Sequence, residues 1–143
     1  MRPVLLAALL LGCSSPVRTV AIDYAATDDQ RAALNESVSA WNLRLLPDRR
    51  LRHASSPDVD AFVLIGDPRN GTHGVWRESE GRITIRGDIN GDLFRRTLRH
   101  ELGHAIGLEH TSCGVMQFRE DSFPELTFCD DDIRECRNAG ACP

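Results

Sequence analysis

Short apolar runs and alternating apolar and polar residues recur along the first two thirds of the chain. The alternation at residues 18–24 predicts a β-strand, and residues 49–53 are expected to form a brief second one. Residues 59–66 form a continuous apolar run, which predicts a strand buried on both faces. Residues 74–76 and 82–86 flank a Ser-Glu-Gly segment and predict a hairpin.

Two further segments carry apolar residues at helical spacing. The first helix is expected to start after Thr27, an N-cap residue type followed by two acids, and to stop before Pro47. Its apolar face consists of Leu34, Val38, Trp41 and Leu45. The second helix is expected at residues 93–108. This order of elements predicts a mixed α+β fold, with helices packed against a mixed sheet.

Composition and charge limit the class of protein. At 143 residues, 41% of them hydrophobic, the chain has the size of one globular domain. The net charge of -4 is small, and acidic residues and arginines are interspersed along the sequence. Nucleic-acid binding would need a basic face, so we expect no nucleic acid among the partners. We also expect a monomer.

The first residues resemble an export signal. Residues 1–12 start with a basic residue after Met1 and contain an apolar run of about nine residues, which is typical of a secretion signal and too short to span a bilayer. Cys13 follows a small residue and resembles the lipidated cysteine of bacterial lipoproteins. The resemblance implies an exported lipoprotein with residues 13–17 as lipidated N-terminus and tether. Ser14 favours outer-membrane anchoring, at the periplasmic face or the cell surface. An ordinary signal peptide with an incidental cysteine is the alternative.

The most specific motif is HELGHAIGLEH, which begins at His100. Four helical residues span about 400° of rotation, so His100 and His104 project from the same side and can supply two corners of a zinc tetrahedron. Glu101 lies beside them, within reach of a water on the metal. Gly107 can adopt a positive φ and end the helix, which lets His110 turn back as a third ligand. Three protein ligands leave one position for water, as in catalytic zinc sites; a helix with surface histidines is the alternative.

Together with Met116, this motif resembles the metzincin clan of zinc endopeptidases, H-E-x-x-H-x-x-G-x-x-H followed by a Met-turn. The resemblance implies that Met116 forms a hydrophobic floor beneath the zinc. Within the clan the chain looks most like a minimal bacterial matrixin, and residues 126–136 resemble the matrixin C-terminal helix, with Thr127 as its cap. Astacins and serralysins carry a tyrosine two residues after the methionine, where this chain has Phe118.

The resemblance implies a metzincin-like fold of class α+β within a catalytic domain at residues 18–143. We expect a twisted mixed sheet of four to five strands, two long helices, an active-site helix and a short C-terminal cysteine-bearing subdomain. It also implies one catalytic Zn²⁺, a peptide or protein substrate, and peptide-bond hydrolysis through a zinc-bound water with Glu101 as general base. The substrate is expected along residues 74–77, and residues 117–126 are expected to wall its pocket.

The remaining cysteines are expected to form disulfides. With Cys13 set aside, an even number is left, namely Cys113, Cys129, Cys136 and Cys142. Outside the cytosol this predicts two disulfides, for which three pairings are possible. We expect them to attach the tail to the loop after His110. A second zinc bound by the four cysteines is the alternative, although no C-x-x-C pair is present.

Two other functions stay open at the level of sequence. The chain could be a zinc-binding or interaction lipoprotein with little or no peptidase activity, or a zinc hydrolase acting on peptidoglycan peptides. A weak calcium site also stays open, because Asp88, Asn90 and Asp92 imitate the start of an EF-hand loop. Leu93 occupies the glycine position of that loop, and Arg99 occupies the position of its final glutamate.

Overall fold

The computed structural model describes residues 17–69, 71–118 and 126–143. The predicted signal, Cys13 and nearly all of the predicted tether lie outside the described residues, as does most of the predicted wall at 117–126. In the part that is described, no helix has the length and apolar character needed to cross a membrane. The elements are, in order, β1 (Thr19–Ile22), α1 (Asp28–Asn42), η1 (Pro47–Arg49), β2 (Arg52–His53), β3 (Ala61–Gly66), β4 (Gly74–Arg77), η2 (Glu78–Glu80), β5 (Arg82–Arg86), α2 (Gly91–Ala105) and α3 (Asp130–Asn138).

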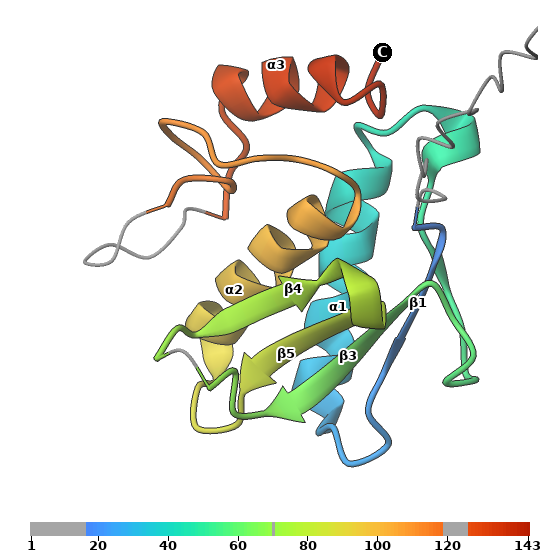
Figure 1. Ribbon diagram of the computed structural model, residues 1–143, viewed down its shortest axis with the longest axis vertical. Helices are drawn as coiled ribbons and strands as arrows, with labels where there is room; N and C mark the ends of the chain where they lie inside the picture. Colours follow the sequence, from blue (N-terminus) through green and yellow to red (C-terminus); the bar gives the residue numbers. More distant parts are fainter. Residues whose placement is uncertain (1–16, 70, 119–125) are drawn as a thin grey trace, which may run out of the picture.

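The five strands form one mixed sheet in the order β2-β1-β3-β5-β4. β1 pairs in parallel with both β2 and β3, and β3 pairs in parallel with β5. The hairpin predicted from the sequence is confirmed, since β4 runs antiparallel to β5 with Trp76 opposite Ile83. β4 therefore lies at an edge of the sheet, in front of α2 (Figure 1).

Helices α1 and α2 lie on the same face of the sheet and contact each other (Figure 1). The predicted cap of α1 is confirmed: the Thr27 hydroxyl accepts a hydrogen bond from the Gln30 N–H, and the Gln30 side chain accepts one from the Thr27 N–H. The helix ends at Asn42, whose side-chain amide makes two hydrogen bonds to the backbone of Leu51. The predicted apolar residues Leu34, Val38, Trp41 and Leu45 are all buried, but α1 ends earlier than expected, so Leu45 lies beyond the helix.

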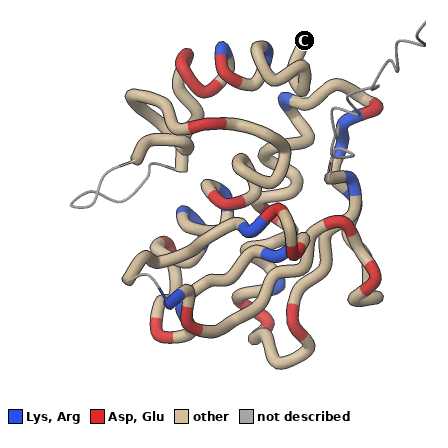
Figure 2. Tube along the Cα trace, viewed as in Figure 1, with Lys and Arg blue, Asp and Glu red and all other residues tan. Residues whose placement is uncertain are grey.

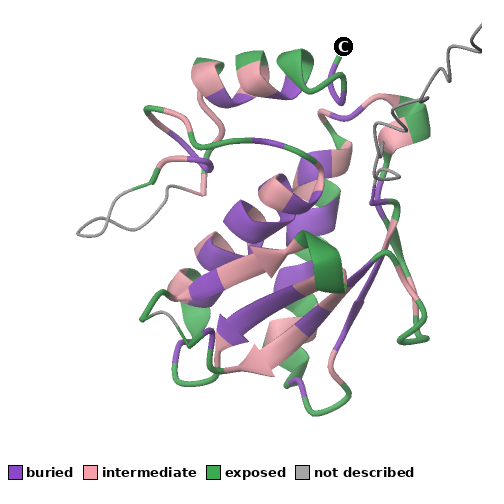
Figure 3. Ribbon diagram, in the orientation of Figure 1, coloured by how far each residue is buried: buried purple, intermediate pink, exposed green. Residues whose placement is uncertain are grey.

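One expectation about the sheet is wrong. β3 is not buried on both faces: Ala61 and Val63 are fully buried, whereas Phe62 and Leu64 are only partly buried. Side chains alternate between the two faces of a strand, and both long helices lie on the same face of the sheet (Figure 3), so the residues of β3 on the other face stay partly exposed. The two long helices are α1 and α2, each of fifteen residues. The HELGH segment lies on α2, so the expected active-site helix is one of these two helices and not a third one.

The C-terminal region differs from the expectation in two respects. Thr127 does not cap α3, because the helix begins only at Asp130; Cys129 is its N-cap, and its N–H donates to Asp132 Oδ2 at 3.0 Å. The Cys113–Cys129 disulfide attaches α3 to the loop after His110, as expected. The Cys136–Cys142 disulfide instead lies within the tail, so only one of the two bonds joins the tail to that loop.

Basic and acidic residues alternate along much of the described chain in Figure 2, although α3 begins with three consecutive aspartates. Two of the oxygen-bearing residues considered for calcium contact arginines. Asp88 Oδ2 lies 2.6 Å from Arg86 Nη2, and Asp92 Oδ1 lies 3.8 Å from Arg95 Nη1.

Candidate metal centre

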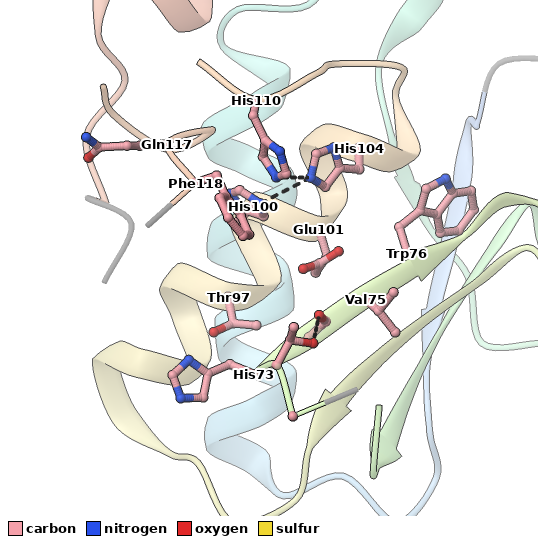
Figure 4. Close-up of a pocket in the computed structure, with 13 residues that line it drawn as sticks. His73, Val75, Trp76, Thr97, His100, Glu101, His104, His110, Gln117 and Phe118 are labelled. Carbon is pink, nitrogen blue, oxygen red and sulfur yellow. Dashed lines mark hydrogen bonds between the residues drawn. The ribbon is translucent and has the colours of Figure 1, made fainter. Parts of the chain in front are cut away.

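The C-terminal part of α2 and the turn after it bring the three motif histidines together. His100 and His104 lie on α2 one turn apart, and the helix ends at Ala105. Gly107 follows with φ 97°, a conformation that strongly favours glycine, and the Leu108 N–H donates to the Gly103 carbonyl at 3.0 Å. This turn reverses the chain and carries His110 back to the side of α2 that holds the other two rings (Figure 4).

Backbone carbonyl groups fix the tautomers of two histidines. His100 Nδ1 lies 2.8 Å from the Val115 carbonyl oxygen, and His104 Nδ1 lies 2.7 Å from the Leu108 carbonyl oxygen. A carbonyl oxygen can only accept, so each Nδ1 carries the proton of a neutral ring and each Nε2 keeps its lone pair. This is the arrangement in which a histidine ligates a metal through Nε2.

The three Nε2 atoms converge, and two of the distances between them are close to the spacing that zinc requires. His104 Nε2 lies 3.1 Å from His100 Nε2 and 3.1 Å from His110 Nε2, and the three candidate ligand atoms all lie within 4.8 Å of one another. Zn–N bonds of about 2.0–2.1 Å at tetrahedral angles place two ligand nitrogens about 3.3 Å apart. Lone pairs that face each other at this distance repel unless a cation lies between them. The donor set therefore fits Zn²⁺.

Burial favours the neutral form of two of these rings, His100 and His110. His100 is buried, and desolvation lowers its pKa to about 4, with neighbouring His104 and His110 acting in the same direction and the Val115 hydrogen bond opposing them. Desolvation, followed by the proximity of His104, also lowers the pKa of His110. Neutral imidazole is the metal-binding form, so at neutral pH protons compete weakly for these nitrogens.

Glu101 extends its side chain from α2 toward the edge strand β4 (Figure 4). Its side chain is buried, and desolvation raises the pKa of this carboxyl to about 7, while a hydrogen bond from the Trp76 backbone acts in the opposite direction. β4 can approach this closely because residue 74 is glycine: a Cβ there would lie 3.0 Å from Glu101 Cγ and 2.6 Å from Thr97 Cγ2. A carboxyl group with a pKa near neutrality can both take up and release a proton.

The site opens into a cavity of about 670 Å³ along β4 (Figure 4). The cavity is lined by the three histidines, Glu101, residues 71–76, Thr97, Gln117 and Phe118. The Phe118 ring is 58% exposed and lies 4.8 Å from the His110 ring, so it forms an apolar wall next to one candidate ligand. The segment predicted to bind substrate, residues 74–77, corresponds to β4.

Met116 packs against the backbone of α2 at Gly103. Its side chain is fully buried, and a Cβ built on Gly103 would lie 2.2 Å from Met116 Sδ. The methionine therefore touches α2 between the positions of His100 and His104. Its location agrees with a hydrophobic floor, and the glycine at 103 is required for this contact.

Sequence reasoning missed Asp132, which the structure places behind the site. Asp132 is fully buried and accepts hydrogen bonds from the backbone of Val115 and Met116. The only signal for it was the run of three aspartates at 130–132, which is typical of any helix N-terminus. Nothing local to that run indicates contact with residues sixteen or seventeen positions earlier.

No family model matches the chain. In a comparison with curated proteins, it is 29% identical over 97 residues to a serralysin of Photorhabdus sp. (strain Az29), covering 58% of this chain and 20% of that protein. It is 27% identical over 95 residues to a serralysin of Photorhabdus laumondii subsp. laumondii, covering 57% and 20%. The chain thus spans about a fifth of the length of these relatives. Both are serralysins. A tyrosine is expected in that group at the position where this chain has Phe118.

The solved structures show the fold. Two structures of myroilysin match with TM-scores of 0.51 and 0.50, at 20% and 19% identity. Each match covers 66% of this chain, and 42% and 44% of the respective myroilysin chain. Together with the histidine triad, these comparisons show a metzincin-like zinc metallopeptidase fold, as the sequence motif predicted.

Proposed function

We propose that the chain is a zinc-dependent endopeptidase. The observation that carries this proposal is the convergence of three histidine Nε2 atoms beside the buried carboxyl of Glu101, at an edge strand with an adjoining cavity. His100, His104 and His110 would hold the metal. When bound there, zinc polarises the scissile carbonyl group and lowers the pKa of water.

Glu101 acts as the general base in this proposal. It removes a proton from the attacking water and then delivers it to the leaving amine, which requires a group that exchanges protons near neutral pH. The raised pKa of Glu101, caused by its burial, supports this role. The Val115 and Leu108 carbonyls hold the tautomers of His100 and His104 throughout the reaction.

The substrate lies extended along β4. β4 is an edge strand, paired on one side with β5, and its residues 74–76 line the cavity next to Glu101. An extended peptide can add to such an edge through main-chain hydrogen bonds. Phe118 offers an apolar surface to a substrate side chain on the side of His110.

The test compares zinc-loaded wild type with Glu101→Ala on a peptide library, a protein and purified peptidoglycan. We expect the wild type to cleave peptides and Glu101→Ala to retain zinc but lose at least about a hundredfold of kcat/KM. Glu78→Ala serves as the control, because this exposed glutamate lies outside the cavity that contains the histidine triad. Zinc binding without turnover would favour a binding lipoprotein, and cleavage of peptidoglycan alone would favour a cell-wall hydrolase.

We further propose export and lipidation through Cys13. The two disulfides support this, because such bonds persist in oxidising compartments and together they use every cysteine except Cys13. Cys13→Ser is expected to move the protein from the membrane fraction to the soluble extracytoplasmic fraction. Retention of the variant in membranes would contradict the proposal.

A further inference from the structure

We propose that the Cys113–Cys129 disulfide is a positioning element for the metal site, so that formation of this bond raises the affinity for zinc. The inference rests on the proposed zinc site and concerns how that site is held. Cys113 lies between the candidate ligand His110 and the floor residue Met116, and Cys129 is the N-cap of α3. The bond thus joins the segment that completes the metal site to a separate helix.

The two segments are packed without room between them. Gly114 follows Cys113 with φ 71°, and a Cβ built on it would lie 2.1 Å from Asp132 Oδ2, 2.8 Å from the Cys129 nitrogen and 2.9 Å from Cys129 Sγ. Only a glycine allows this approach. The disulfide therefore closes a contact in which backbone lies directly against backbone.

Asp132 adds hydrogen bonds that connect the start of α3 with residues 111–116. Its carboxylate accepts hydrogen bonds from the N–H groups of Val115 at 2.8 Å, Met116 at 3.1 Å and Cys129 at 3.0 Å. The Thr111 hydroxyl lies 2.8 Å from Asp132 Oδ1 and donates to it. The bonds from Thr111, Val115 and Met116 form only while α3 stays in place, and the disulfide is the covalent connection that keeps the start of α3 there.

The contacts between the start of α3 and residues 111–116 support two of the three candidate ligands. The Val115 N–H donates a hydrogen bond to Asp132, and the Val115 carbonyl oxygen accepts one from His100 Nδ1 at 2.8 Å. Thr111 follows His110 in the chain, and its N–H donates to the Met116 carbonyl at 3.0 Å. If the start of α3 separates from this segment, both the orientation of His100 and the return of His110 lose their support.

The chemistry is a thiol–disulfide exchange. The Cys113 and Cys129 thiols lose two protons and two electrons as the S–S bond forms, and a small-molecule or protein disulfide of an oxidising compartment takes up both and becomes two thiols. The metal site would thus reach full affinity only after export to such a compartment. Loss of a group that orients a metal-binding histidine typically lowers metal affinity by 10–100-fold.

The matched control is the second disulfide. Cys136–Cys142 also involves α3, but it joins the last turn of that helix to the residues that follow it, not to the segment that carries His110 and Met116. We therefore compare Cys113→Ser/Cys129→Ser with Cys136→Ser/Cys142→Ser. The zinc Kd of each folded protein is measured by competition with a chelator, and folding is verified by circular dichroism. We expect the first variant to bind zinc at least about tenfold more weakly, and the second to match the wild type.

A measurement on the wild type covers the case in which the first variant does not fold. Because coupling between two equilibria is reciprocal, zinc must favour the oxidised form of Cys113–Cys129 by the same factor, and a tenfold effect corresponds to about 30 mV. The redox midpoint of each disulfide is measured with and without zinc by thiol alkylation and mass spectrometry. We expect zinc to shift Cys113–Cys129 and to leave Cys136–Cys142 unchanged. Equal zinc affinities in both variants, or equal shifts of both disulfides, would overturn the inference; absence of zinc binding by the wild type would instead overturn the proposed function.

Discussion

Replacement of Glu101 by glutamine is expected to stabilise the metal-free protein while it abolishes catalysis. Burial raises the pKa of Glu101 from 4.5 to about 7. Between these values the unfolded chain releases this proton and the folded chain keeps it, so folding becomes less favourable as pH rises, and the full penalty is present above pH 7. A rise of this size corresponds to about 3 kcal/mol. Glutamine has nearly the same shape, can accept the Trp76 hydrogen bond and cannot ionise.

The assay is urea denaturation of wild type and Glu101→Gln in excess chelator at pH 4.5, 6 and 8, followed by the fluorescence of buried Trp41. We expect the variant to be more stable by up to about 3 kcal/mol at pH 8, with the difference falling as pH decreases and nearly absent at pH 4.5. Histidine protonation is common to both proteins. The exposed control Glu78→Gln is expected to show no such trend. A wild type as stable as Glu101→Gln at pH 8 would refute the reasoning about burial.

Three further perturbations test other parts of the structure. Thr27→Ala removes the hydroxyl that accepts the hydrogen bond of the Gln30 N–H, and it is expected to lower the free energy of unfolding by about 1 kcal/mol in urea denaturation; unchanged stability would contradict the cap. Gly103→Ala places a Cβ against Met116 Sδ and is expected to destabilise by about 1–3 kcal/mol and to weaken zinc binding. An unchanged zinc Kd would show that the contact between Gly103 and Met116 does not affect the metal site. Chelation should lower Tm, and zinc at a hundredfold of its Kd should restore about 2.7 kcal/mol; a Tm insensitive to zinc would contradict binding to the folded state.

Much of the fold could be predicted because its determinants are local. The cap at Thr27, the hairpin around η2 and the turn at Gly107 each depend on residue types within a few positions of one another. The convergence of the three histidines follows from helical spacing together with one glycine, so it too could be read from eleven consecutive residues. The strand at residues 74–77, along which the substrate is expected, lies at an edge of the sheet.

The remaining features depend on contacts between distant segments. Asp132 binds Val115 and Met116 across the chain, and no pattern near residue 132 distinguishes it from the neighbouring aspartates. The disulfide pairing depends on where α3 packs, which composition does not determine. Burial of β3 on one face required knowing that both long helices lie on the same side of the sheet.

The central claim is that one zinc ion, held by His100, His104 and His110, supports peptide hydrolysis. The most direct measurement is a titration of the metal-free protein with zinc, in which bound metal and peptide cleavage are determined in the same samples. We predict that both rise together and saturate at one zinc per chain. Cleavage that persists without zinc, or zinc that saturates the site without any cleavage of peptides, would contradict the claim.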